Sequence, residues 1–308
     1  MKKTITIIIL LILIAFIIPL VYAQKVLDWA PSHQTDNQAP NIFSATSTYI
    51  ANIGLALQPY FFQKNNIPPK EDSKPTPTPP VKKFEVPPKP YRFLLVGDSS
   101  MAVSGGFGDI LEQKLISYAD TFVVRDGKVS SGLSRPDYFN WNTQAAADVA
   151  AHAPNIAVVM IGDNDAQGFS IFADGKKQDI AYGTARWDEE YQKRVRDFAS
   201  IFTSRDIIVY WVGLPAMRDP GFAARIEHVN ELQMKALMGD GLVKFISGQD
   251  LMAGKNKYEP FMPDEQGIMR ATRNADGIHL SYFGGTILTD KIIVKLKQDI
   301  DLEIKNGN

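Results

Sequence analysis

The sequence predicts an α/β fold for residues 91–308, in which a mainly parallel five-stranded sheet lies between two layers of helices. Two observations lead to this prediction. From Tyr91 onward, short apolar runs alternate with longer segments of helical character, an order typical of parallel sheets with crossover helices. Runs such as 207–212 are apolar throughout, as expected for strands covered on both faces. The pattern therefore favours a flavodoxin-like α/β/α sandwich.

The elements follow one another along the chain as strand and then helix. The strands are expected at 92–96, 121–125, 156–161, 206–212 and 242–246. The helices are expected at 107–118, 143–152, 187–203, 220–238 and 283–299. In open sheets of this kind, ligands bind outside the carboxyl ends of the strands. Polar residues directly after the strands are therefore the first candidates for a site.

The first 90 residues are expected to differ from this domain. Residues 1–23 combine two early lysines, an apolar stretch and a small residue, as in a signal peptide, but the stretch is also long enough for a membrane anchor. Residues 24–67 are expected to be a juxtamembrane segment, partly helical. Residues 68–90 hold nine of the 19 prolines and are expected to be an extended linker. The domain at 91–308 should then be exported, periplasmic or extracytoplasmic, and it is tethered to the cytoplasmic membrane if the first segment is retained as an anchor.

Composition excludes several classes of function. The net charge is −1, and no basic patch is interleaved with aromatic residues, so nucleic acid is not expected as a partner. The absence of cysteine excludes disulfides, thiolate catalysis and a cysteine-linked lipid anchor.

Groups that could perform acyl transfer stand at the two ends of the domain. Gly97-Asp98-Ser99-Ser100 follows the first expected strand, and Asp276 precedes His279 by three residues. A serine cannot attack an ester at neutral pH without a base, and the base needs an orienting acid. Ser99 is therefore the candidate nucleophile, although a helix N-cap is the simpler reading of a lone serine there.

The candidate base follows by elimination among the four histidines. His33 lies before the linker, His152 ends an expected helix, and His228 lies within another, where we expect a solvated surface position. Only His279 has a carboxylate at close spacing in a loop before a helix. Asp276 is the expected orienting acid.

A third polar segment, Gly162-Asp163-Asn164-Asp165, follows another apolar run. Asn164 at a strand end is a plausible oxyanion donor, and an ordinary turn asparagine is the alternative. The aspartates at 98, 163 and 165 are expected to tie loop backbone together rather than to act on substrate.

These segments, together with an isolated Gly132, resemble in order and spacing the four sequence blocks of the SGNH (GDSL-type) hydrolase superfamily. The resemblance covers about 91–300. It implies a catalytic triad of Ser99, His279 and Asp276. It also implies an oxyanion hole made by the backbone N–H groups of Ser99 and Gly132 and by the Asn164 amide. The runs 131–141 and 211–218 are similar to a poorly characterised bacterial envelope branch with an N-terminal membrane segment.

Substrate contacts are less constrained by the sequence. Trp141 and Trp211 could stack on sugar faces, and core packing is the alternative for both. Arg135 and Arg218 could bind an anionic group of the substrate, and salt bridges are the alternative, for example between Arg135 and Asp137.

The sequence thus predicts a serine esterase or deacylase that removes O-acyl groups, in the first place acetyl, from an envelope glycan and needs no cofactor or metal. An O-acyltransferase with the same acyl-enzyme and a membrane acyl-donor partner is the alternative. A two-metal phosphoesterase and a non-catalytic envelope assembly protein are minor alternatives. The expected partner is an acylated polysaccharide or another ester substrate.

Overall fold

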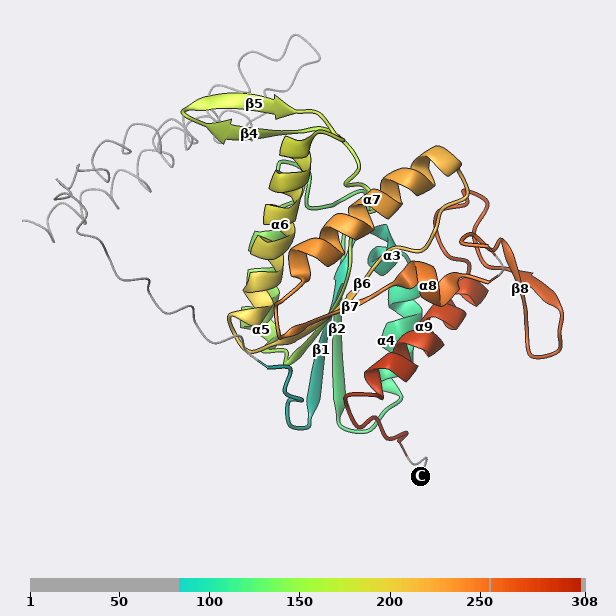
Figure 1. The fold of residues 1–308 in the computed structure, drawn as a ribbon. Coiled ribbons are helices and arrows are strands. Elements are labelled where there is room, and N and C mark those ends of the chain that lie inside the picture. Colours follow the sequence, from blue (N-terminus) through green and yellow to red (C-terminus); the bar gives the residue numbers. More distant parts are fainter. Residues whose placement is uncertain (1–82, 255, 306–308) are drawn as a thin grey trace, which may run out of the picture. The chain divides into compact units, whose positions relative to one another are not determined.

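The computed structural model describes residues 83–254 and 256–305, and Figure 1 shows a central parallel sheet with helices on both sides. Its strand order is β2-β1-β3-β6-β7. In chain order this is 2-1-3-4-5, the flavodoxin-like arrangement, so the predicted fold class is confirmed. The strands are β1 (Tyr91–Gly97), β2 (Thr121–Gly127), β3 (Ile156–Met160), β6 (Ile208–Val212) and β7 (Val243–Ile246).

The core lies around the three inner strands. Every residue of β3 and β6 is buried, whereas the edge strands β2 and β7 are mostly half-buried. Strands β1 and β3 approach closely where they end, because a Cβ on Gly97 would lie 1.9 Å from the carbonyl oxygen of Met160. A glycine is therefore required two residues before Ser99, which begins the short helix α3 (Ser99–Ala102).

Two groups of helices cover the sheet (Figure 1). Helix α4 packs against α9, and α6 packs against both α5 and α7. The bounds are α4 (Phe107–Ile116), α5 (Trp141–His152), α6 (Ala185–Thr203), α7 (Pro220–Leu237), α8 (Gly248–Met252) and α9 (Tyr282–Leu296). All five expected helices are present.

Side-chain caps set the starts of all these helices except α4, which begins after Gly106 without one. A side-chain oxygen of the residue before the helix accepts a backbone N–H of the first turn, which would otherwise lack a partner. The capping residues are Asn140 for α5, Thr184 for α6, Asp219 for α7, Ser247 for α8 and Ser281 for α9. The cap on Ser281 places the start of α9 directly after the loop that carries His279.

Two β-hairpins were not expected from the sequence. Strands β4 (Phe169–Ala173) and β5 (Lys176–Ile180) pair between β3 and α6, and β8 (Phe261–Pro263) pairs with β9 (Met269–Ala271) before the His279 loop. Asp174 and Gly175 join the first pair, both with positive φ. Asp-Gly at a two-residue turn is a strong hairpin signal, so this element could have been found from the sequence.

The predictions for 1–23 and 24–67 lie outside the described residues, as does most of the linker at 68–90. Its last residues, 83–90, have no regular structure and reach the domain through a Phe84–Tyr210 ring contact and a Lys89–Asp301 ion pair. Among the helices of the described ranges, none combines the length and apolar character needed to cross a membrane.

Candidate active site

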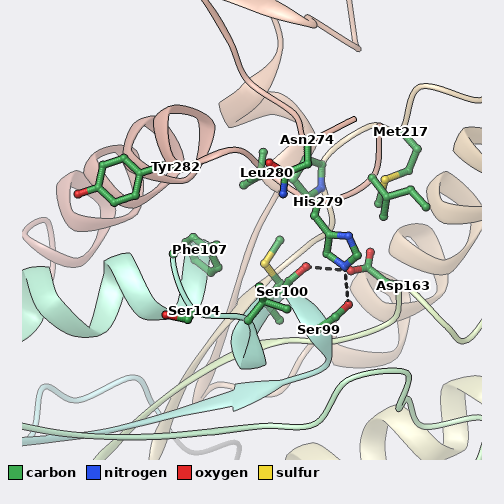
Figure 2. A pocket seen from close by; sticks show the side chains of 16 residues that line it. Ser99, Ser100, Ser104, Phe107, Asp163, Met217, Asn274, His279, Leu280 and Tyr282 are labelled. Carbon is green, nitrogen blue, oxygen red and sulfur yellow. Dashed lines mark hydrogen bonds between the residues drawn. The ribbon is translucent and has the colours of Figure 1, made fainter. Parts of the chain in front are cut away.

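Ser99, His279 and Asp276 form one row of hydrogen-bonded side chains at the carboxyl end of the sheet. Figure 2 shows the contact between Ser99 and His279. The Oγ of Ser99 lies 2.8 Å from Nε2 of His279. The Nδ1 of His279 lies 2.7 Å from Oδ2 of Asp276. Ser99 is buried, while the His279 and Asp276 side chains are 32% and 42% exposed, so a substrate can reach the row from solvent. The fold thus brings together the three residues predicted as a triad.

The loop that carries the base is held by its own aspartate. The Oδ1 of Asp276 accepts the backbone N–H groups of Ile278 and His279 at 2.8 and 3.0 Å. Partial burial by itself raises the pKa of Asp276, but the His279 ring and these N–H groups outweigh burial and lower it. Gly277 turns the chain with a φ of 73°. Asp276 therefore stays ionised and holds both the imidazole and the loop.

Arg218 also belongs to this loop. Its Nη2 donates to the Asp276 carbonyl oxygen at 3.0 Å, and its backbone N–H donates to the Gly277 carbonyl oxygen at 3.0 Å. A Cβ on Gly277 would lie 2.6 Å from the Arg218 side chain, so glycine allows this packing. Arg218 therefore holds the loop backbone, a role that the sequence did not predict, and its binding of an anionic substrate stays a prediction.

The three predicted oxyanion donors lie on the loops after β1, β2 and β3. The Asn164 amide donates to the Ser131 carbonyl oxygen at 2.9 Å, next to Gly132, and its second N–H is left for another acceptor. Within the described ranges, the backbone N–H groups of Ser99 and Gly132 donate to no protein acceptor. Each of the three therefore has an N–H available, as an oxyanion hole requires.

The buried side chain of Asp165 fixes the loop that contains Gly132. A Cβ on Gly132 would lie 2.1 Å from Oδ1 of Asp165, so only glycine fits. The same Oδ1 accepts the Ser134 backbone N–H at 2.8 Å, and Oδ2 accepts the Tyr191 hydroxyl at 2.8 Å. Burial raises the pKa of Asp165. As predicted, this aspartate ties loop backbone together.

The support behind Asp165 was missed from the sequence. Gln233 Nε2 donates to the Tyr191 hydroxyl oxygen at 3.0 Å and to the Ile161 carbonyl oxygen at 2.7 Å, and Trp211 Nε1 donates to Gln233 Oε1 at 2.9 Å. Tyr191 and Gln233 are fully buried on different helices. Buried polar residues at helix positions otherwise occupied by apolar ones were the signal that could have found them.

Asp98 and Asp163 connect the segment 97–100 with the segment 162–165. Asp98 accepts the backbone N–H groups of Gly162, Asp163 and Ser100 at 2.9, 3.0 and 3.1 Å. Asp163 accepts the Ser100 hydroxyl at 2.8 Å. Burial, followed by the charge of Asp163, raises the pKa of Asp98 well above its usual value, and burial raises that of Asp163. Since the Ser100 hydroxyl turns to Asp163, Ser99 alone of the two serines faces His279.

Trp141 and Trp211 do not reach the site surface. Their exposed fractions are 2% and 0%, and the Trp141 indole N–H donates to Ser131 Oγ at 2.9 Å. The prediction that they stack on sugars is therefore wrong for both, and core packing is the role that the structure shows. Arg135 forms a two-pronged ion pair with Asp137, the alternative foreseen for it, and is not in the cavity at Ser99.

The other described histidines lie elsewhere. The His228 side chain is 32% exposed, contacts Asp188 at 2.9 Å and stacks on the Trp187 ring, so it is only partly solvated and has partners that the sequence did not predict. His152 is the exposed last residue of α5, and His33 lies outside the described residues. In the described part of the chain, no three His, Cys, Asp or Glu side chains are grouped closely enough to hold a metal ion.

A cavity of about 180 Å³ opens beside the triad. It is smaller than the roughly 300–1,000 Å³ pockets that hold drug-sized ligands, so it suits a small group. We call it the His279 cavity, and its lining includes Ser104, Phe107, Asp163, Asn274, His279 and Tyr282 (Figure 2).

Comparison with known proteins supports the fold. The family described as protein of unknown function DUF459 matches residues 92–295. The curated proteins contain no match. LAE5, an α/β hydrolase enzyme from the metagenome of Lake Arreo, Spain, superimposes with a TM-score of 0.50 at 14% identity over 68% of this chain and 97% of that chain. TesA superimposes with a TM-score of 0.48 at 17% identity, over 68% of this chain and 99% of that chain. A catalytic mutant of Axe2, an acetylxylan esterase from Geobacillus stearothermophilus, superimposes with a TM-score of 0.48 at 15% identity, over 67% of this chain and 94% of that chain.

Proposed function

We propose that this chain, which belongs to the DUF459 family and has the SGNH hydrolase fold, is a serine esterase that works through an acyl-Ser99 intermediate. The observation that carries the proposal is the continuous row from Ser99 through His279 to Asp276. A serine hydroxyl within hydrogen-bond reach of an imidazole, itself oriented by a carboxylate, is the arrangement that activates serine for acyl transfer.

The reaction follows from these contacts. As Ser99 Oγ attacks the ester carbonyl carbon, its proton passes to Nε2 of His279, and Asp276 stabilises the imidazolium that forms. The negative charge on the carbonyl oxygen is held by the N–H groups of Ser99, Gly132 and Asn164. His279 then protonates the alcohol oxygen as its bond to carbon breaks. In the second half of the reaction His279 takes a proton from water as the water oxygen attacks the acyl carbon, and it returns that proton to Ser99 Oγ as the bond between Oγ and the acyl carbon breaks.

We propose O-acyl groups of an envelope glycan, chiefly acetyl, as the substrate. The cavity volume of about 180 Å³ beside the triad supports an ester with a small group on that side of Ser99. The basic and apolar character of residues 1–23 supports an enzyme exported across the cytoplasmic membrane, where such glycans lie. Cell fractionation of the native protein tests the location, and recovery of the chain in the cytosolic fraction would contradict it.

The first test is turnover of p-nitrophenyl acetate by the full chain. Ser99→Ala should lower kcat by at least about 10³-fold. Ser204→Ala is the matched control, because Ser204 is exposed at the end of α6, away from the site. Wild-type activity in Ser99→Ala would refute the proposed nucleophile.

Covalent labelling separates an inactive assay substrate from an inactive site. A fluorophosphonate probe should modify the wild type and Ser204→Ala but not Ser99→Ala. The same acyl-enzyme would support transfer to a sugar hydroxyl, the alternative expected from the sequence. Mass spectrometry of the products with added sugar distinguishes free acetate from an acetylated sugar.

A further inference from the structure

The His279 cavity lies on one side of the reacting serine. Its lining contains both Ser99 and His279 but neither Gly132 nor Asn164, which provide two of the three oxyanion donors. The carbonyl oxygen of a bound ester must point toward those donors. The cavity is therefore on the side of Ser99 that faces the base, away from the carbonyl oxygen.

This position decides which part of an ester the cavity holds. In the first half of the reaction the C–O bond to the alcohol breaks, and the proton taken from Ser99 Oγ passes from His279 Nε2 to the alcohol oxygen. The alcohol oxygen must then lie within hydrogen-bond reach of Nε2. Since the cavity adjoins His279, we propose that it is the subsite for the alcohol part of the ester, and that it selects an uncharged sugar. This inference rests on the esterase activity proposed above.

Two polar residues around the cavity, Asn274 and Ser104, have a fixed backbone and, among the described residues, a side chain without a hydrogen-bond partner. The backbone of Asn274 is held by bonds with His279 and Gly277, at 2.9 Å each, and the backbone beside Ser104 is held by a bond from Gly105 N–H to Asp109 Oδ2 at 2.7 Å. Within the described ranges, the Asn274 amide and the Ser104 hydroxyl have no protein partner. A hydroxyl and an amide can each donate to and accept from a sugar hydroxyl.

The aromatic residues complete a sugar-sized site. Tyr282 at the start of α9 lines the cavity and is 70% exposed, and Phe107 at the start of α4 lines it as a buried residue; Figure 2 shows Tyr282 at the end of the lining far from His279. An exposed aromatic ring offers a flat apolar face with a polar tip. Such a ring suits a pyranose, which has an apolar face and a rim of hydroxyl groups.

The charges around the cavity exclude an anionic sugar. No lysine or arginine lines it, and its one carboxylate is Asp163. Neither Arg218 nor Arg273 lines the cavity: Arg218 donates to the Asp276 carbonyl oxygen, and Arg273 is buried and donates to the Ala216 carbonyl oxygen. A carboxylate or phosphate on the sugar would meet Asp163 with no lysine or arginine in the lining to pair with it, which is unfavourable.

Paired substrates test the inference on the full chain. The esters are a mono-acetylated methyl glucoside, the corresponding acetylated methyl glucuronide, whose carboxylate adds one negative charge, and p-nitrophenyl acetate. All three give the same acyl-enzyme, so differences report on the alcohol part. We expect kcat/KM to be at least about 10-fold higher for the glucoside than for the glucuronide.

The variants separate the subsite from the triad. Asn274→Ala and Ser104→Ala should each lower kcat/KM for the glucoside by about 3- to 10-fold, mainly through KM, and should lower it less for p-nitrophenyl acetate, whose alcohol part has no free hydroxyl group to bond with them. Asn274→Lys should reduce or reverse the preference against the glucuronide. Asn142→Ala, an exposed residue on α5 outside the cavity, is the matched control and should change nothing.

Equal losses on all three esters in Asn274→Ala would mean a general effect on the His279 loop and would overturn the subsite. Equal wild-type rates for glucoside and glucuronide would overturn the charge selection. Failure of the esterase proposal is a separate result: the wild type would then cleave none of the esters and would not react with the fluorophosphonate probe.

Discussion

The hydroxyl of Tyr191 donates a hydrogen bond of 2.8 Å to Oδ2 of Asp165, and both side chains are fully buried. The other carboxylate oxygen of Asp165 holds the loop that contains Gly132. The position of one oxyanion donor therefore depends on a tyrosine of α6 in the interior of the domain. Tyr191 therefore affects the reaction through the position of Gly132, without contacting the substrate.

Tyr191→Phe should lower kcat by about 3- to 10-fold with little change in KM, because the Gly132 N–H loses its fixed position. It should also lower the free energy of unfolding by about 1–3 kcal/mol, since a buried carboxylate loses a donor. Urea denaturation and p-nitrophenyl acetate kinetics measure the two effects.

Tyr210→Phe is the matched control for this variant. Its hydroxyl donates to Asp299 at 3.0 Å, away from the site. We expect Tyr210→Phe to lose stability but keep the wild-type kcat. A wild-type kcat in Tyr191→Phe would contradict the positioning role.

Asn164→Ala should lower kcat by about 10²- to 10³-fold, equivalent to about 3 kcal/mol, because a preorganised donor to the oxyanion is lost. Steady-state kinetics on p-nitrophenyl acetate measure this loss. In a Ser99→Ala background the same change should have almost no further effect, because residues that act as a unit are not additive. An effect of less than fivefold in the single variant would remove Asn164 from the oxyanion hole.

Arg218→Ala should lower kcat by about 3- to 10-fold on neutral and anionic esters alike, because the guanidinium holds the Asp276–Gly277 backbone. Arg135→Ala removes an exposed ion pair and should leave kinetics unchanged. The comparison uses kcat and KM for one neutral and one anionic acetyl ester. A selective rise in KM for the anionic ester in Arg218→Ala would support the anion-binding role.

Asp148 predicts a pH-dependent stability that is separate from catalysis. Burial, followed by the neighbouring Asp126, raises the pKa of Asp148 from 3.8 to about 6. The folded chain binds this proton more tightly than the unfolded chain. The stability from this group is therefore complete below pH 3.8 and is lost as the pH rises to about 6.

Asp148→Asn is always neutral, so it should match the wild type near pH 4 and exceed its stability by about 1 kcal/mol above pH 6. Thermal melting at both values measures the difference. Asp137→Asn should show the reverse trend, because Arg135 lowers the pKa of Asp137. If the stability difference between Asp148→Asn and the wild type were the same at all pH values, the raised pKa of Asp148 would be contradicted.

The five sheet strands, the five main helices and the three members of the triad could be predicted from the sequence. Each depends on local information: apolar runs for strands, periodicity for helices, and short polar motifs at strand ends. The parallel topology then brings distant motifs such as Ser99 and His279 to one edge of the sheet. Asp174-Gly175 shows that the hairpin between β4 and β5 was also within reach of local rules.

Only the tertiary structure decided which side chains face substrate and which face the interior. Trp141 and Trp211 have the chemistry of sugar binding, yet packing buries both, and Arg218 makes a hydrogen bond with the loop backbone that the sequence did not predict. Hydrogen bonds join Asp165 to Tyr191 of α6, and Tyr191 to Gln233 of α7, so they connect a loop and two helices that are far apart in sequence. Amphipathic and charged side chains can satisfy their polar groups in several ways, and the choice among them depends on neighbours that only the folded chain supplies.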